Sequence, residues 1–251
     1  MSYSEFLYAV RKYLEKLRSK VVFYDHLLEL KYVFKDREDG GLTLAKLLIE
    51  NNVHRGIDYI LAIPRGGLPV AYTVSKKLSI KMDIVTVRKV LIPWNTEAGY
   101  GAVAPDGTVV INEPLKEHLG FSVKEVEEHV KTTLTEVRRR EELFRRSKGY
   151  DIFKNMKVIV IDDGIASGYT MLVAVKFLKN IGTSKVYVGA PTASLSSIKL
   201  LYPYADMIYV PNIRSDFWGF AVAEAYIKWY DLTDEEVLSI IKKAKSEGLY
   251  V

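Results

Sequence analysis

Hydrophobic and polar residues follow two different periods along this chain, and each period predicts one kind of element. Near the N-terminus, apolar residues recur at alternating spacings of three and four, which predicts one apolar stripe on a helix. The stripe consists of Leu7, Val10, Leu14, Leu17 and Val21. Such a stripe must be covered, and we favour the core of the same chain over a contact with a second copy. A shorter helix is predicted at residues 42–50.

The rest of the chain alternates between apolar runs and helical patterns, which is typical of a parallel sheet. Strands are predicted at residues 57–63, 82–87, 157–161, 185–190 and 207–210. Helices are predicted between them at residues 68–78, 169–180 and near 196–201. The sequence therefore predicts a doubly wound α/β fold with a mostly parallel central sheet.

Residues 88–113 interrupt this alternation. Pro93, Gly99, Gly101 and the turn sequence at 105–107 break up two short β-prone runs, so a flexible loop followed by a hairpin is predicted there.

Two capping boxes predict the starts of the remaining helices. Ser122 with Glu125 opens a long charged helix to about residue 148, and Thr233 with Glu236 opens the closing helix. The long helix carries arginines at 138–140 and 145–146, interleaved with glutamates. Because they point to several faces, we interpret them as a solvated or intersubunit face and expect no nucleic-acid partner.

Composition narrows the classes of function. The 251 residues are 49% hydrophobic and 27% charged, which suits one globular core. No apolar run approaches the roughly 18 residues of a membrane span, and the first 20 residues lack a secretory pattern, so we expect a cytoplasmic protein with no membrane partner. The absence of cysteine excludes disulfides and thiolate nucleophiles, and no histidine pair has zinc-ligand spacing. The net charge of +5 suits an anionic ligand without identifying it.

The segment 158–163, VIVIDD, predicts a ligand site at the end of a central strand. Ligands bind at the carboxyl ends of strands in open α/β sheets, and Asp162 and Asp163 occupy that position. Adjacent carboxylates are costly to hold together unless they meet donors. The two vicinal hydroxyls of a ribose are such donors, and a nearby Mg²⁺ would offset the charge.

The residues after the acid pair predict a phosphate cradle. They are Gly164, Ile165, Ala166, Ser167, Gly168, Tyr169 and Thr170. They lead into a helix, whose free N–H groups bind anions together with the hydroxyls of Ser167 and Thr170. The signatures G-x-x-x-x-G-K-[ST], G-x-G-x-x-G and G-x-S-x-G are absent from the sequence, so nucleoside triphosphatase, nicotinamide and hydrolase readings lack their residues.

The segment 162–170 resembles the signature of type I phosphoribosyltransferases that binds 5-phosphoribosyl 1-diphosphate (PRPP). That signature has two acids, a short loop with Thr-Gly and a closing Thr or Ser, and Ser167 here replaces the usual Thr. The likeness to a poorly characterised group of the family covers about the last 220 residues, through 34–37, 61–71, 87–89, 101–103 and 234–237.

The resemblance implies a division of the chain. An N-terminal helical extension would occupy residues 1–33, and a phosphoribosyltransferase domain residues 34–251. Within that domain, residues 88–113 would form a flexible loop or hairpin and residues 211–230 a hood over the base. A homodimer is the family expectation.

The resemblance also assigns the diphosphate side of the site. The strand-to-helix turn at 64–67 would be the pyrophosphate loop, with Arg65 holding the diphosphate and Gly66 and Gly67 letting the backbone approach. Lys89, with Arg88 behind it, would reach the pyrophosphate, although solvated charges at a strand end are the alternative.

Phe217 and Trp218 lie where the family builds its hood, so they are candidates to stack on the base. The plainer alternative is a local packing cluster.

The implied reaction moves the phosphoribosyl group of PRPP to a ring nitrogen of a base in nucleotide salvage, with Asp162, Asp163, Arg65 and Lys89 catalytic. Mg²⁺ is the expected cofactor, held by the two acids indirectly through PRPP or water. The loop at 65–67 resembles xanthine-guanine enzymes, whereas Ala166 resembles adenine and uracil enzymes, and we favour a purine. The alternatives are a regulator on this fold that binds PRPP or nucleotides without catalysis, and an unrelated doubly wound nucleotide-binding protein.

Overall fold

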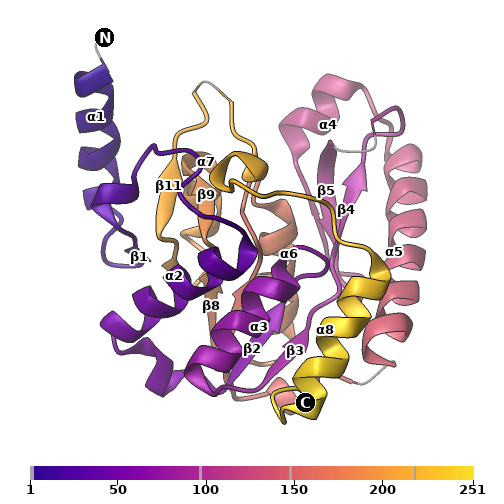
Figure 1. The fold of residues 1–251 in the computed structure, drawn as a ribbon. Coiled ribbons are helices and arrows are strands. Elements are labelled where there is room, and N and C mark those ends of the chain that lie inside the picture. Colours follow the sequence, from indigo (N-terminus) through magenta and orange to yellow (C-terminus); the bar gives the residue numbers. More distant parts are fainter. Residues whose placement is uncertain (1–2, 96–97, 147–148, 218) are drawn as a thin grey trace.

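Six parallel strands form the central sheet, in the order β1-β10-β8-β7-β2-β3 (Figure 1). The computed structural model describes residues 3–95, 98–146, 149–217 and 219–251. In sheet order, the strands are Val21–Val22, Met207–Tyr209, Lys185–Gly189, Lys157–Ile161, Tyr59–Ala62 and Met82–Ile84. All strands except β1 were predicted from the sequence, so the five strand predictions and the doubly wound α/β fold are confirmed. The prediction for Val21 was wrong, because this residue pairs with Ile208 in an edge strand instead of extending the first helix.

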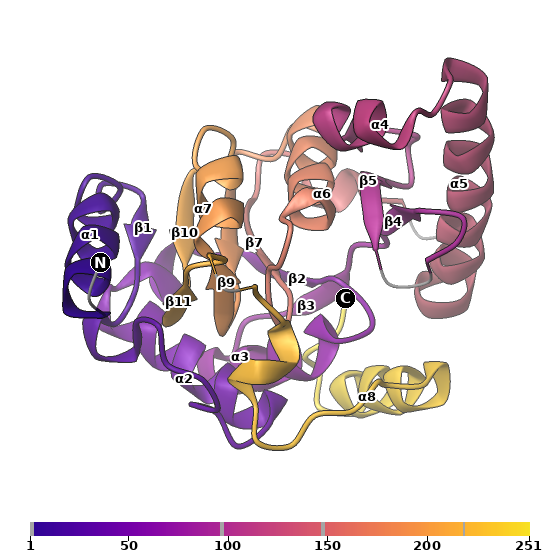
Figure 2. The ribbon, with the colours of Figure 1, turned by 90° about the horizontal axis from the view of Figure 1, so that it is seen from above.

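Helices cover both faces of this sheet (Figure 2). The first face carries α1 (Tyr3–Glu15), α6 (Tyr169–Asn180) and α7 (Leu195–Leu201), and the second carries α2 (Arg37–Glu50), α3 (Gly67–Leu78) and α8 (Asp234–Ser246). In β7, Val158 and Val160 join the core on the first face, and Ile159 and Ile161 join the core on the second. Successive side chains of a strand point to opposite faces, which explains the unbroken apolar run. No helix in the described part of the chain is long and apolar enough to cross a membrane.

The N-terminal stripe packs on the core of its own chain, as favoured from its spacing. Val10, Leu14 and Leu17 of this stripe are buried against the sheet face that carries α6 and α7. The next helix, α2, begins five residues earlier than predicted, at Arg37, because the carboxylate of Asp36 accepts a hydrogen bond from the backbone N–H of Asp39 at 3.1 Å.

Three strands between residues 88 and 111 form an antiparallel sheet, which differs from the predicted loop with one hairpin. β4 (Arg88–Leu91), β5 (Gly99–Val103) and β6 (Val109–Ile111) pair in that order. Val90 and Tyr100 are buried in a separate small core beneath α4 (Glu113–Leu119) and α5 (Val123–Arg145). The strand β4 therefore begins at Arg88, where a loop was predicted, and its residue Val90 is buried.

Both predicted capping boxes are present. The side chains of Ser122 and Thr233 accept from the backbone N–H three residues later, and Glu125 and Glu236 accept from the cap backbone in return. α8 therefore starts at Asp234, whose carboxylate lies 3.5 Å from the guanidinium of Arg65.

Arg145 shows that the interpretation of the α5 arginines as a solvated face was wrong in part. Its guanidinium is buried, lies 2.8 Å from Asp83 and 2.6 Å from Glu141, and covers the ring of Tyr150 at 3.7 Å. This buried ion pair fastens the end of α5 to the edge strand β3.

We expect Asp83→Asn to lower the free energy of unfolding by about 3 kcal/mol, because it leaves the Arg145 charge buried with one partner fewer. Urea denaturation measures the loss. Lys46→Gln is the matched control, because it removes an exposed pair with Glu50 at 3.7 Å that contributes about 0.5 kcal/mol or less. Equal effects of the two substitutions would contradict this account.

Candidate functional site

A cavity of about 690 Å³ opens where β2 and β7 end and α3 and α6 begin, a volume typical of ligand sites. It brings together most of the residues singled out from the sequence, although they are far apart along the chain. These are Arg65, Gly66, Lys89, Asp162, Asp163, Gly164, Ile165, Ala166, Ser167, Gly168 and Thr170.

The other predicted residues lie elsewhere. Arg88 lines an adjoining hollow of about 240 Å³, which shares Lys89 and Asp162 with the main cavity. Gly67 is buried beneath the cavity wall, and Tyr169 is partly buried against the core on the α6 face. The side chain of Phe217 is 72% exposed, and its ring lies 6.3 Å from that of Phe6 rather than in the cavity wall. Trp218 lies outside the described residues.

The acid pair sits at the carboxyl end of β7 in a largely desolvated place. The backbone N–H of Asp163 donates to the carboxylate of Asp162 at 2.9 Å, and Arg37 donates to the carboxylate of Asp163 at 2.8 Å. Burial raises the pKa of Asp162, and the neighbouring charge of Asp163 raises it further. Burial also raises the pKa of Asp163, against the lowering effect of Arg37. Ionisation of both carboxyls is therefore costly until a ligand or cation approaches.

Two glycines let the turn after β2 press against this acid pair. A Cβ on Gly66 would lie 1.9 Å from a carboxylate oxygen of Asp163, and a Cβ on Gly67 would lie 2.6 Å from the carbonyl oxygen of Ile161. Both separations are shorter than real Cβ contacts, so only glycine fits. Gly66 and Gly67, predicted to let the backbone approach a diphosphate, thus also leave room for Asp162 and Asp163.

The loop after the acids is held by a second small sheet, β9 (Thr192–Ser194) with β11 (Asn212–Arg214). Ile165 donates to the carbonyl of Thr192 at 3.0 Å, and Ser194 donates to the carbonyl of Ala166 through its hydroxyl at 2.6 Å. Gly168 takes φ of 83° and caps α6. The first N–H groups of α6 have no acceptor within the helix, so this fixed loop presents donors to an anion.

Arg140 is a cavity residue that sequence reasoning missed. It extends from α5 to line both hollows, near Arg65, Arg88 and Lys89. Burial, followed by the charges of Arg88 and Arg65, lowers the pKa of Arg140 to about 10. Its buried Nε atom has no hydrogen-bond partner within the described residues. Cations that repel one another around an unused donor form a site suited to a polyanion.

The family follows from comparison with known proteins. The model of the phosphoribosyl transferase domain matches residues 35–226. The chain belongs to the phosphoribosyl transferase family. Two Mycobacterium tuberculosis proteins, provisionally named phosphoribosyl transferases, are 30% identical to it over 212 residues. That segment is 84% of this chain and 47% of each relative, so the chain spans about half the length of these curated relatives.

One solved structure agrees on the fold of this family member. The crystal structure of TT1426 from Thermus thermophilus matches with a TM-score of 0.66 at 30% identity, over 84% of this chain and 98% of that one. A purine phosphoribosyltransferase from Pyrococcus horikoshii matches with a TM-score of 0.42 at 15% identity, over 81% and 100%, and is too distant to indicate an acceptor. The resemblance to type I phosphoribosyltransferases is confirmed.

The far wall of the cavity at the acid pair comes from the segment predicted to be the hood and the residues after it. Aromatic side chains there are Phe220 and Trp229, neither of which was singled out from the sequence. The buried Arg37 links this wall to Asp163, and its guanidinium lies 3.9 Å from the centre of the Trp229 ring. Its only signal in the sequence was its place in the family-like stretch 34–37.

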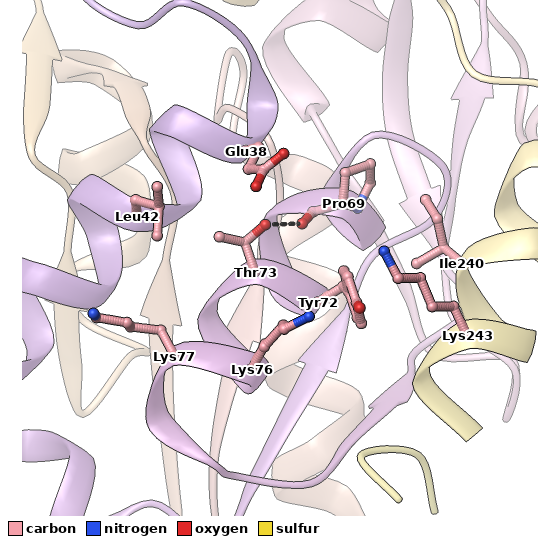
Figure 3. Close-up of a pocket in the computed structure, with 9 residues that line it drawn as sticks. All are labelled: Glu38, Leu42, Pro69, Tyr72, Thr73, Lys76, Lys77, Ile240 and Lys243. Atoms are coloured by element: carbon pink, nitrogen blue, oxygen red, sulfur yellow. Dashed lines mark hydrogen bonds between the residues drawn. The ribbon is translucent and has the colours of Figure 1, made fainter. Parts of the chain in front are cut away.

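A second hollow, of about 440 Å³, lies among α2, α3 and α8 (Figure 3). Leu42 and Ile240 give it an apolar lining, and Lys76 beside it is paired with Glu247 at 3.3 Å. It contains none of the predicted site residues and no strand end. The cavity at the acid pair is therefore the candidate active site.

We expect Asp162→Asn to stabilise the apo-protein increasingly as pH rises. A carboxyl whose pKa is raised by folding binds its proton more tightly in the folded state, so stability falls as pH rises from the ordinary Asp pKa of about 3.9 through the raised value. Asn removes that fall. Thermal unfolding of both proteins in chelator-treated buffer over this range measures the difference, at about 2–4 °C per kcal/mol. Parallel stability curves for the two proteins would show that folding does not disfavour ionisation of the Asp162 carboxyl.

Proposed function

We propose that this phosphoribosyl transferase moves the 5-phosphoribosyl group of PRPP to a ring nitrogen of a nucleobase and releases pyrophosphate, as in nucleotide salvage. The observation that carries the proposal is one cavity with an acid pair, a helix-capping loop and a group of cations. Each part matches one part of PRPP: the ribose diol, the 5-phosphate and the diphosphate. The phosphate-binding signatures G-x-x-x-x-G-K-[ST] and G-x-G-x-x-G are absent from the sequence.

The ribose would be held by hydrogen bonds from its hydroxyls to Asp162 and Asp163, with its phosphate against the loop 164–170. Arg65 and Lys89 would hold the diphosphate, with Arg88 and Arg140 adding to the positive field. The reacting carbon develops positive charge as the bond to pyrophosphate breaks, so no protein nucleophile is required. Rate acceleration then comes from orientation and from cations that stabilise the leaving group.

The donor set fits Mg²⁺ that is shared with the ligand. Carboxylate oxygens are suitable ligands, and burial beside a like charge makes Asp162 and Asp163 favour an added cation. No group of three or more metal-binding side chains occurs in the described residues, so the remaining oxygens would come from PRPP or water. When bound, Mg²⁺ would neutralise charge on the departing pyrophosphate.

The base would lie against the hood side of the cavity. Phe220, Val222, Trp229 and Leu232 line that side, so they are better placed than Phe217 to contact a flat ring. A purine stays our favoured acceptor because of the loop at 65–67. The domain division at residues 33 and 34, the homodimer and the cytoplasmic location stay predictions.

We expect wild-type protein with PRPP and Mg²⁺ to release pyrophosphate with one member of a panel of adenine, guanine, hypoxanthine, xanthine, uracil and orotate. The double variant Asp162→Asn with Asp163→Asn should lose this turnover at least a hundredfold, because the ribose and cation lose their partners. Asp151→Asn, an exposed acid outside the cavity, is the control. Turnover retained by the double variant would refute the assignment, and PRPP binding without turnover on any base would favour a regulator.

A second expectation separates Arg140 from its neighbour. Arg140→Ala should weaken pyrophosphate binding, measured by calorimetry, about tenfold or more, because a partly buried cation facing the diphosphate is lost. It should not lower the Tm, because the removed charge is repelled by Arg88 and Arg65. Arg138→Ala removes an exposed cation of the same helix that lines neither hollow, and it should change affinity less than threefold. Equal losses would indicate only a general field effect.

A further inference from the structure

Arg37 joins three parts of the chain that are distant in sequence. Its Nε donates to the carboxylate of Asp163 at 2.8 Å, and its Nη1 donates to the backbone carbonyl of Tyr230 at 2.8 Å. Its guanidinium also covers the ring of Trp229 at 3.9 Å. The residue is 7% exposed and lines the cavity wall. One side chain therefore spans from the acid pair to the hood.

The surroundings hold this side chain in one arrangement. Arg37 is the first residue of α2, which Asp36 caps, so its backbone is fixed. Within the hood, Tyr226 donates through its hydroxyl to the backbone carbonyl of Asp163, and its ring lies 5.3 Å from that of Trp229. The Trp229 ring thus contacts both Tyr226 and Arg37, and each of these two also bonds to Asp163.

The same carboxylate oxygen of Asp163 is enclosed from the other side. It accepts from Arg37, and a Cβ on Gly66 would lie 1.9 Å from it. This oxygen is taken up within the protein, while Asp162 and Asp163 both line the cavity. Arg37 therefore ties the hood to one carboxylate oxygen of the acid pair.

We propose that Arg37 is a positioning residue that fixes the hood relative to the acid pair, and so sets where the acceptor stands relative to the ribose. The proposal rests on the proposed function, in which the acids hold the ribose and the hood holds the base. Arginine suits the task because its planar fork donates in two fixed directions while its face stacks on a ring. Lysine keeps the charge but cannot make both bonds and the stack.

The test compares Arg37→Lys with Arg145→Lys. Arg145 has matching chemistry outside the cavity, with a carboxylate at 2.8 Å and an aromatic ring at 3.7 Å. In Arg37→Lys, we expect PRPP affinity, measured by calorimetry without acceptor, within about threefold of wild type, because the charge beside Asp163 is kept. We expect the acceptor KM to rise and kcat to fall at least tenfold, because a displacement of 1 Å can cost about a hundredfold in rate. Arg145→Lys should change neither KM nor kcat more than about threefold.

Two outcomes of this comparison would overturn the proposal. One is Arg37→Lys with acceptor KM and kcat both within threefold of wild type. The other is an equal loss in the two lysine variants, which would reduce Arg37 to a contribution to folding.

A readout without substrate keeps this test separate from the proposed function. In the apo-protein, Arg37→Lys should speed hydrogen exchange of hood amides at residues 219–230 about tenfold or more, whereas Arg145→Lys should leave them unchanged. If wild type turns over no base, the proposed function fails while the exchange result still decides the role of Arg37. Unchanged exchange in Arg37→Lys would overturn the proposal even in an active enzyme.

Discussion

The burial of two adjacent carboxylates at the end of β7 is the constraint on which the rest of this site depends. Burial and mutual repulsion raise the pKa of Asp162, so the pair is held at a cost. Much of the nearby structure serves to hold it: Arg37 pairs with Asp163, Tyr226 bonds to its backbone, and Gly66 gives it room. A ligand with hydroxyl donors, or a cation, would lower the free-energy cost of ionising the two buried carboxyls, and this gain would favour binding.

The adjoining part of the cavity carries an excess of positive charge. Burial, followed by the charges of Arg88 and Arg65, lowers the pKa of Arg140, and Asp234 at the start of α8 offsets this only in part. The protein thus keeps excess negative and excess positive charge in adjoining parts of one cavity. The proposed ligand, PRPP with Mg²⁺, would complement both, because it would bring hydroxyls and a cation to the acids and a diphosphate to the arginines.

Secondary elements that are remote in sequence supply the two groups of charge. The acids and the phosphate loop come from one strand-to-helix connection, whereas Arg37, Lys89 and Arg140 come from α2, β4 and α5. The buried pair of Arg145 with Asp83 secures the end of α5 against the main sheet. A structural ion pair and a candidate ligand-binding cation, Arg140, therefore lie on one helix.

The sequence by itself determined whatever depends on neighbours along the chain. The apolar runs predicted five of the six central strands, the capping boxes predicted two helix starts, and the segment 158–170 predicted the acid pair and its loop, because strand, turn and helix cap are local. It misplaced Val21 and did not single out Arg37, Arg140 and Trp229. Only the tertiary structure revealed the positions of these residues. Spacing along a helix shows which face a side chain occupies, but not which residue from a distant part of the chain it contacts. Phe217 was chosen from its position in a family pattern, and the packing of the hood placed Phe220 and Trp229 in the cavity instead.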